Sequence, residues 1–88
     1  EMVYVAGEIA KPGSIELGER DSISVAQIVA MSGGLAKTAA AERALVLRPI
    51  LNSNRRAEIP VNVKEILAGK AHDFPLHPND VLMIPSSG

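Results

Sequence analysis

The sequence predicts a single α+β domain, in which a mixed sheet wraps around one main helix and a second short helix. Three observations predict this class: strand-length segments of alternating polarity, a capped helix between two pairs of strands, and a fully apolar final segment. The chain has 88 residues, which gives room for one domain over residues 1–88. Its composition, 47% hydrophobic and 22% charged, is typical of globular proteins and excludes a disordered tail or a coiled coil.

The first segment reads as a β-hairpin. Residues 2–9 alternate in polarity, residues 11–14 (KPGS) have the composition of a type II turn, and Ile15 and Leu17 continue as a short return strand. A glycine inside a strand indicates a bulge or a close backbone approach, and we expect one of these at Gly7.

The main helix follows the hairpin. Ser24 and Gln27 form the S-x-x-Q pattern of a capping box, which predicts that the helix begins directly after Ser24. Gly33 and Gly34 stand where a left-handed cap is needed, and Leu35 should fold back as the apolar contact after the cap. The predicted buried face consists of Val25, Ile28 and Val29.

The middle of the chain reads as a second pair of strands. Residues 43–51 predict one strand, in which Pro49 indicates an edge or a strand end. Residues 52–55 (NSNR) form a polar turn, and residues 58–61 predict another short strand with an edge-type proline.

The last third of the chain predicts a short helix and a final strand. Asn62 caps the helix and Gly69 stops it. Residues 73–76 are extended, and residues 77–80 (HPND) form a turn. Residues 81–84 (VLMI) are apolar without alternation, which predicts a central strand buried on both faces.

The resulting order is β-β-α-β-β-α-β. A short chain with this order of elements can bury its apolar faces by packing a mixed sheet around one principal helix, with the terminal strand inserted beside the first strand. This is the β-grasp arrangement. Only Tyr4 and Phe74 are aromatic, so the core of this domain must be aliphatic.

Five motifs along the chain carry a family resemblance. They are VYVAGEIAKPG at 3–13, AMSGGL at 30–35, VLR at 46–48, PVN at 60–62 with ILAG at 66–69, and LHPNDVLMIP at 76–85. Their order and spacing resemble the SLBB (soluble-ligand-binding β-grasp) domain of bacterial polysaccharide export proteins of the outer membrane. The family more often has Ala-Gly-Gly where Ser32, Gly33 and Gly34 stand here. The resemblance implies repeated SLBB modules in a ring-forming periplasmic body with the polymer passing through its centre.

Composition and motifs exclude several other kinds of function. The net charge of −1 gives no overall field to hold a nucleic acid, and the absence of cysteine excludes disulfides and thiolate chemistry. No apolar run has the length of a membrane span. Since no set of side chains converges on an acid–base or nucleophilic arrangement, we expect no enzyme activity and no cofactor.

The sequence does not favour a metal site at residues 72–77. His72, Asp73 and His77 are suitable ligand types, but a closed zinc site needs four ligands, and Pro75 breaks any helical spacing between them. We therefore expect these side chains to decorate the loop before the last strand.

The most distinctive polar feature is the segment of residues 35–56, which carries five basic residues and one acidic residue. It contains no aromatic side chains for base stacking, so an acidic polymer or an acidic patch on a neighbouring copy fits better than a nucleic acid. Arg48 lies in mid-strand and should make a fixed contact, either an ion pair with an acid such as Asp80 or Glu58, or a ligand contact. The candidate ligand-binding residues are Lys37, Arg48, Asn52, Asn54, Arg55 and Arg56.

The expected function is therefore a non-catalytic module of a polysaccharide (capsule or exopolysaccharide) export protein. It would contribute to a homo-oligomeric ring in the periplasm, associated with the outer membrane, and contact polysaccharide in transit; an inner-membrane export partner fits this setting. Glu1 and the trailing residues 86–88 read as cut ends, so we expect a piece of a longer protein. The alternatives are a cobalamin-like small-ligand module and an interaction domain of another assembly, such as a DNA-uptake protein or a respiratory complex.

Overall fold

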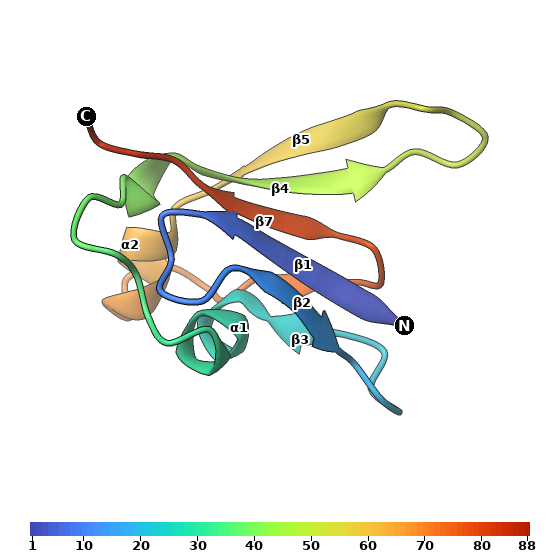
Figure 1. Cartoon of the computed structure of the whole chain (residues 1–88), viewed down its shortest axis with the longest axis horizontal. Coiled ribbons are helices and arrows are strands. Elements are labelled where there is room, and N and C mark those ends of the chain that lie inside the picture. The colour runs from blue at the N-terminus through green and yellow to red at the C-terminus, as the bar shows by residue number, and fades with distance from the viewer.

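The computed structural model describes residues 1–88 and is built on a five-stranded mixed sheet in the order β2-β1-β7-β4-β5 (Figure 1). The strands are β1 (Met2–Gly7), β2 (Gly13–Glu16), β4 (Ala44–Pro49), β5 (Arg56–Val61) and β7 (Val81–Ile84). β1 and β7 are parallel, and every other neighbouring pair is antiparallel. The last strand thus lies between β1 and β4, which confirms the predicted α+β fold with its terminal strand beside the first.

The remaining elements lie on one side of this sheet (Figure 1). They are α1 (Val25–Met31), α2 (Val63–Leu67), the 3-10 helix η1 (Ala41–Arg43), and a two-stranded sheet of β3 (Ile23–Ser24) and β6 (Pro75–Leu76). The pairing of β3 with β6 was not predicted, because two residues carry no periodicity. It is fixed by tertiary packing, since Ile23 and Leu76 lie opposite each other and both are buried.

The caps of α1 are those that the sequence predicts. The Ser24 Oγ accepts a hydrogen bond from the Gln27 N–H at 3.1 Å, and the Gln27 side chain accepts one from the Ser24 N–H at 3.0 Å. At the other end Gly33 and Gly34 have φ values of 84° and 89°, and the Gly34 N–H donates to the Val29 carbonyl at 2.9 Å. This is a Schellman closure, in which left-handed residues satisfy the last carbonyls of a helix.

The core is aliphatic, as predicted, and fills the space between the sheet and α1. Each strand of the sheet's centre contributes alternate residues, and α1 contributes the predicted face. The sheet residues include Val3, Val5, Ala44, Val46, Val61, Leu82 and Ile84, and the helix residues are Val25, Ile28 and Val29. Tyr4 lies on the other face of the sheet with 38% exposure, and Phe74 packs only at the edge of the core.

β7 is central, but the prediction that it is buried on both faces was wrong. Leu82 and Ile84 are fully buried, whereas Val81 and Met83 are only partly covered. The physical reason is that the helices cover one face of the sheet and no layer covers the other. The opposite face, here called the outer face, therefore carries partly exposed apolar side chains, namely Met2, Tyr4, Ala6, Leu45, Leu47, Val81 and Met83.

Gly7 makes the close backbone approach that its place in a strand predicts. Its φ is 92°, and a Cβ at this position would collide with the carbonyl oxygen of Ile84. Only glycine therefore lets β1 end against β7 in this way. Immediately after Gly7, the Glu8 N–H donates to the same Ile84 carbonyl at 2.8 Å.

The turn of the first hairpin lies earlier than predicted. β2 begins at Gly13, which pairs with Val5, so the chain reverses over residues 8–12 instead of 11–14. This loop is held by the end of α1, because the Ala10 N–H donates to the Gly34 carbonyl and the Lys11 N–H donates to the Ser32 carbonyl, both at 2.9 Å. A long-range tie therefore overrides the local turn chemistry.

The remaining boundaries differ by a few residues. The predicted strand at 43–51 is shorter because Arg43 belongs to η1, and it ends at Pro49 as the proline indicated. Pro60 lies in the edge strand β5, where a missing N–H is tolerated. Asn62 caps α2 by accepting from the Glu65 N–H at 3.1 Å, and Gly69 follows with a φ of 76°.

Candidate interaction site

The predicted ligand-binding residues do not lie together in the folded molecule. Asn52, Asn54 and Arg55 belong to the turn between β4 and β5, which projects at one end of the long axis of the molecule (Figure 1). The loop between α1 and η1, which contains Lys37, lies at the opposite end (Figure 1). The molecule measures 35 Å along its longest axis, so Lys37 does not join the others in one site.

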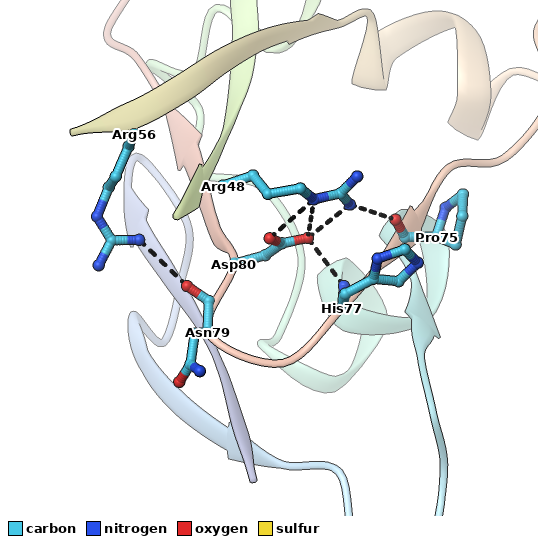
Figure 2. A network of polar contacts seen from close by, with 6 residues as sticks. All are labelled: Arg48, Arg56, Pro75, His77, Asn79 and Asp80. Carbon is cyan, nitrogen blue, oxygen red and sulfur yellow. Dashed lines mark hydrogen bonds and ion pairs between the residues drawn. The ribbon is translucent and has the colours of Figure 1, made fainter. Parts of the chain in front are cut away.

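Arg48 is engaged by a buried carboxylate (Figure 2). Its Nε donates to both oxygens of Asp80, at 3.1 and 3.2 Å, and its Nη2 donates to Asp80 Oδ2 at 2.7 Å. Nη2 also lies 3.3 Å from the carbonyl oxygen of Pro75, and the guanidinium carbon lies 5.6 Å from the centre of the Phe74 ring. Asp80 is fully buried, and it also accepts the His77 N–H at 2.8 Å.

This arrangement gives Arg48 a structural role in the fold. The hydrogen bond with Asp80 raises the pKa of the Arg48 guanidinium above its ordinary value, so this side chain stays positively charged. The pair joins β4 to the turn that precedes β7, and it leaves one nitrogen, Nη1, without a protein partner. Of the contacts expected for Arg48, the structure has the ion pair with Asp80. The Asp80 carboxylate also accepts the main-chain N–H of His77 in its own turn.

The turn of residues 77–80 positions Arg56 as well. Asn79 has a φ of 73° directly after Pro78, and the Asp80 N–H donates to the His77 carbonyl at 3.0 Å, as in a type II turn. The carbonyl oxygen of Asn79 then accepts Arg56 Nη1 at 3.1 Å (Figure 2). This bond ties the Arg56 side chain to the turn before β7, while the residue stays exposed.

The projecting turn is the most exposed part of the chain that carries predicted site residues. The Ile50 N–H donates to the Arg55 carbonyl at 3.1 Å, which closes a tip formed by residues 51–54. The side chains of Asn52, Asn54 and Arg55 make no hydrogen bond to the rest of the protein and are free to bind a ligand. Leu51 is 88% exposed beside them. Sequence reasoning missed Leu51, although an apolar residue directly before a polar turn is a visible signal.

The side chains at this tip offer hydrogen-bonding groups. Two amides and a guanidinium can bind hydroxyl and carboxylate groups, and the guanidinium can bind a carboxylate through two parallel hydrogen bonds. No nucleophile with an adjacent base lies among residues 50–56. The tip also has no aromatic platform, so its contacts with a sugar ring would be polar and weak.

His72, Asp73 and His77 lie in the segment between α2 and β7. Nowhere do three or more His, Cys, Asp or Glu side chains gather in an arrangement that could hold a metal ion. Asp73 Oδ1 accepts the Ala26 N–H at 3.1 Å and the Phe74 N–H at 2.9 Å, which ties the loop to the start of α1. His72 and His77 are both exposed, but β6 separates them: His72 lies in the loop between α2 and β6, and only His77 lies in the turn before β7.

A hollow of about 300 Å³ lies beside α2. It is lined by Glu42, Asn62, Lys64, Glu65, Ala68 and Lys70, none of which was predicted as a site residue. Pockets that hold small organic ligands are mostly apolar, whereas Ala68 is the one hydrophobic residue here. The hollow is therefore a polar surface depression with mixed charge.

None of the helices has both the length and the apolar character needed to span a membrane.

The SLBB domain family matches residues 1–84, which is nearly the whole chain. No curated protein sequence matches the chain at a significant level.

Proposed function

The chain belongs to the SLBB domain family, and from that premise we propose that it is a non-catalytic module of a bacterial polysaccharide export protein. The family supports a ligand-binding or polysaccharide-export-type module. The proposal adds that copies of this domain pack side by side in a periplasmic ring associated with the outer membrane, and that they contact the polymer as it passes.

The observation that carries the polymer contact is the projecting β4–β5 turn. It places Arg55 and the amides of Asn52 and Asn54 in solvent with no competing protein contact, and Arg56 lies directly behind them. An acidic polysaccharide offers the carboxylates and hydroxyls that these groups bind. Weak polar contacts also suit a polymer in transit, because tight binding would hold it in place.

The alternatives receive less support from the molecule. A cobalamin-like ligand needs an apolar pocket, and the hollow beside α2 is polar. A DNA-uptake role needs stacking platforms or a strong basic groove, and the two aromatic residues lie outside the basic turn.

The test is a titration of the isotope-labelled chain, followed by NMR, with three compounds: an acidic oligosaccharide, a neutral oligosaccharide of equal length, and cobalamin. We expect amide shift changes confined to residues 51–56 with the acidic sugar, and much weaker changes with the neutral one. Replacement of both Arg55 and Arg56 by Ser should abolish these changes, whereas Lys64→Ser, which removes a positive charge from α2, should leave them. No response at the turn to the acidic sugar would reject polymer contact, and a cobalamin response around α2 would favour the small-ligand alternative.

The ring requires a second test on the export protein that carries this domain. Its mass in solution should correspond to an oligomer. A strictly monomeric protein that still supports export would reject the ring.

A further inference from the structure

Both edges of the five-stranded sheet present unpaired main-chain groups. At the β2 edge, the Leu17 N–H donates to the Glu1 carbonyl at 2.9 Å, and β1 and β2 pair in the register of Val3 with Ile15. In an antiparallel pair the hydrogen-bonding direction alternates along the strand. The N–H and C=O groups of Ser14 and Glu16 therefore point away from β1, and no other protein group bonds them.

The same argument fixes the β5 edge. The Ile50 N–H donates to the Arg55 carbonyl, and the register continues with Arg48 opposite Ala57. The main-chain groups of Arg56, Glu58 and Pro60 therefore point away from β4. All three residues are exposed. Pro60 has no N–H, so only the half of the edge at Arg56 and Glu58 can both donate and accept.

We propose that the β5 edge of one copy adds antiparallel to the β2 edge of a second copy, with Arg56 opposite Glu16 and Glu58 opposite Ser14 of that copy. The proposed side-by-side packing of copies is its premise; the inference names the surfaces and the register. Addition of a strand to an open sheet edge is a common mode of recognition, because it uses the unpaired main-chain groups of both partners.

The residues that face each other across the two strands support this register. Arg56 and Glu16 have opposite charges, and cross-strand pairs of opposite charge stabilise a sheet. Glu58 faces the hydroxyl of Ser14, which can donate to its carboxylate. One step further, Pro60 lies opposite Pro12, and since neither has an N–H, the pairing ends there. Four main-chain hydrogen bonds result, from the residues at both edges that can make them.

The charges at the same end of the two edges are also complementary. The strand directions place the start of β5 and the end of β2 at one end of the sheet, since Arg56 lies opposite Pro49 and Glu16 opposite Met2. The basic groups at the β5 end are Arg55 and Arg56, and the exposed charges at and after the β2 end are Glu16, Glu19, Arg20 and Asp21. Antiparallel docking of β5 on β2 brings the basic end of one copy to the acidic end of the next.

The charged side chains keep free groups for this contact. Arg56 uses Nη1 for the Asn79 carbonyl, and its Nε and Nη2 bond no protein group. Glu16 uses Oε1 for the main-chain nitrogen of Glu1 at 2.9 Å and of Gly18 at 3.3 Å, and its Oε2 accepts no hydrogen bond. The new ion pair therefore needs no existing bond to break.

The competing arrangement is a twofold pairing of β5 with β5, in which Arg56 lies opposite Glu58 of the second copy. It would close as a dimer and leave both β2 edges unused. Docking of β5 on β2 uses two different surfaces and leaves one of each free, so it repeats and can close into a ring. The two arrangements predict different neighbours for residue 58.

The absence of cysteine from the natural chain allows a direct cross-linking test. Ser14→Cys in a tagged chain and Glu58→Cys in an untagged chain are mixed at millimolar concentration with a short thiol cross-linker. We expect a mixed product several-fold above that of either variant with Lys64→Cys, whose thiol lies on α2 away from both edges. Arg56→Glu in the Glu58→Cys chain should remove the product, and Glu16→Arg in its partner should restore it.

The outcomes separate this inference from the proposed function. Absence of the mixed product above the Lys64→Cys control overturns it, and so does a dominant product of Glu58→Cys with itself. If the export protein forms oligomers but the mixed product is absent, the edge assignment fails and the ring stands. If the export protein is monomeric, the ring itself fails.

Discussion

At the scale of single residues, Asp80 is the polar group on which the fold depends most. It is fully buried, and its two oxygens accept four hydrogen bonds, three from Arg48 and one from the His77 main chain. A buried charge is costly unless it is paired and hydrogen-bonded, and here both conditions are met. The pair thereby ties the turn before β7 to the neighbouring strand β4.

Replacement of Asp80 by Asn should lower the free energy of unfolding by about 3 kcal/mol, because it leaves a part-buried guanidinium without its counter-charge. Chemical denaturation measures this loss. Glu58→Gln is a matched control, since Glu58 is exposed and makes no hydrogen bond through its side chain; it should change stability by less than about 0.5 kcal/mol. Equal stability of the two variants would show that the ion pair contributes nothing.

Gly7 is a second single residue on which the stability of the fold depends. Gly7→Ala should destabilise the protein by more than about 3 kcal/mol or prevent folding, because the added Cβ meets the Ile84 carbonyl in a backbone region that is already strained for alanine. Gly18→Ala isolates the strain, since Gly18 also has a positive φ of 65° but has open space around it. It should cost only about 1–2 kcal/mol. Thermal unfolding of the two variants compares them, and similar melting temperatures would contradict the steric argument.

At the scale of elements, the two faces of the central strand β7 differ in burial. Its inner residues Leu82 and Ile84 pack against the core, and its outer residues Val81 and Met83 remain partly exposed. Its position between β1 and β4 gives it hydrogen-bonded neighbours on both sides, while its side chains have a packing layer on one side only.

This asymmetry predicts different costs for neighbouring substitutions. Leu82→Ala should destabilise the protein by about 2–5 kcal/mol, as expected for truncation of a large buried side chain. Met83→Ala, one residue along the same strand, should cost about 1 kcal/mol, because part of its surface is already in water. Denaturant midpoints measure both; equal losses would indicate that the outer face is covered in solution by another surface.

At the scale of the whole molecule, the fold is completed by its last element. β7 joins β1 and β4, which come from opposite halves of the chain, and the parallel contact of β1 with β7 has Val5 beside Leu82. Without β7 the sheet would separate into two antiparallel pairs. Two-stranded hairpins are marginal alone in water, so neither half should persist without the other.

Removal of residues 81–88 should therefore abolish cooperative unfolding and the dispersed NMR spectrum of the folded chain. The matched control shortens the projecting turn: residues 51–54 are replaced by Asn-Gly, a two-residue turn compatible with the hydrogen-bonded pair of Ile50 and Arg55. This variant should remain folded, since the removed residues are exposed and outside the core. A folded, cooperative truncated chain would show that β7 is dispensable.

Features governed by local chemistry could be predicted from the sequence. The capping box of Ser24 and Gln27, the Asn62 cap and the left-handed glycines depend on residues within a few positions of one another. Where a long-range contact competed, local reasoning failed, as at residues 11–14, whose turn was displaced because residues 10 and 11 bond the end of α1. Among the candidate site residues, the sequence distinguished Arg48, as a mid-strand residue with a fixed contact, from the residues of the turn. It could not choose between Asp80, Glu58 and a ligand as the partner of Arg48, because that choice depends on how distant segments pack.

The sequence by itself therefore determined the fold class, the order of elements, the aliphatic core and the membership of residues 1–84 in the SLBB domain family. Only the tertiary structure decided that Arg48 faces Asp80, that Lys37 lies far from the β4–β5 turn, and which main-chain groups of β2 and β5 remain unpaired. The physical reason is the distance along the sequence over which each kind of interaction acts. Caps, turns and periodicity act between residues near in sequence, whereas ion pairs across strands, sheet edges and exposed surfaces exist only once distant segments have packed together.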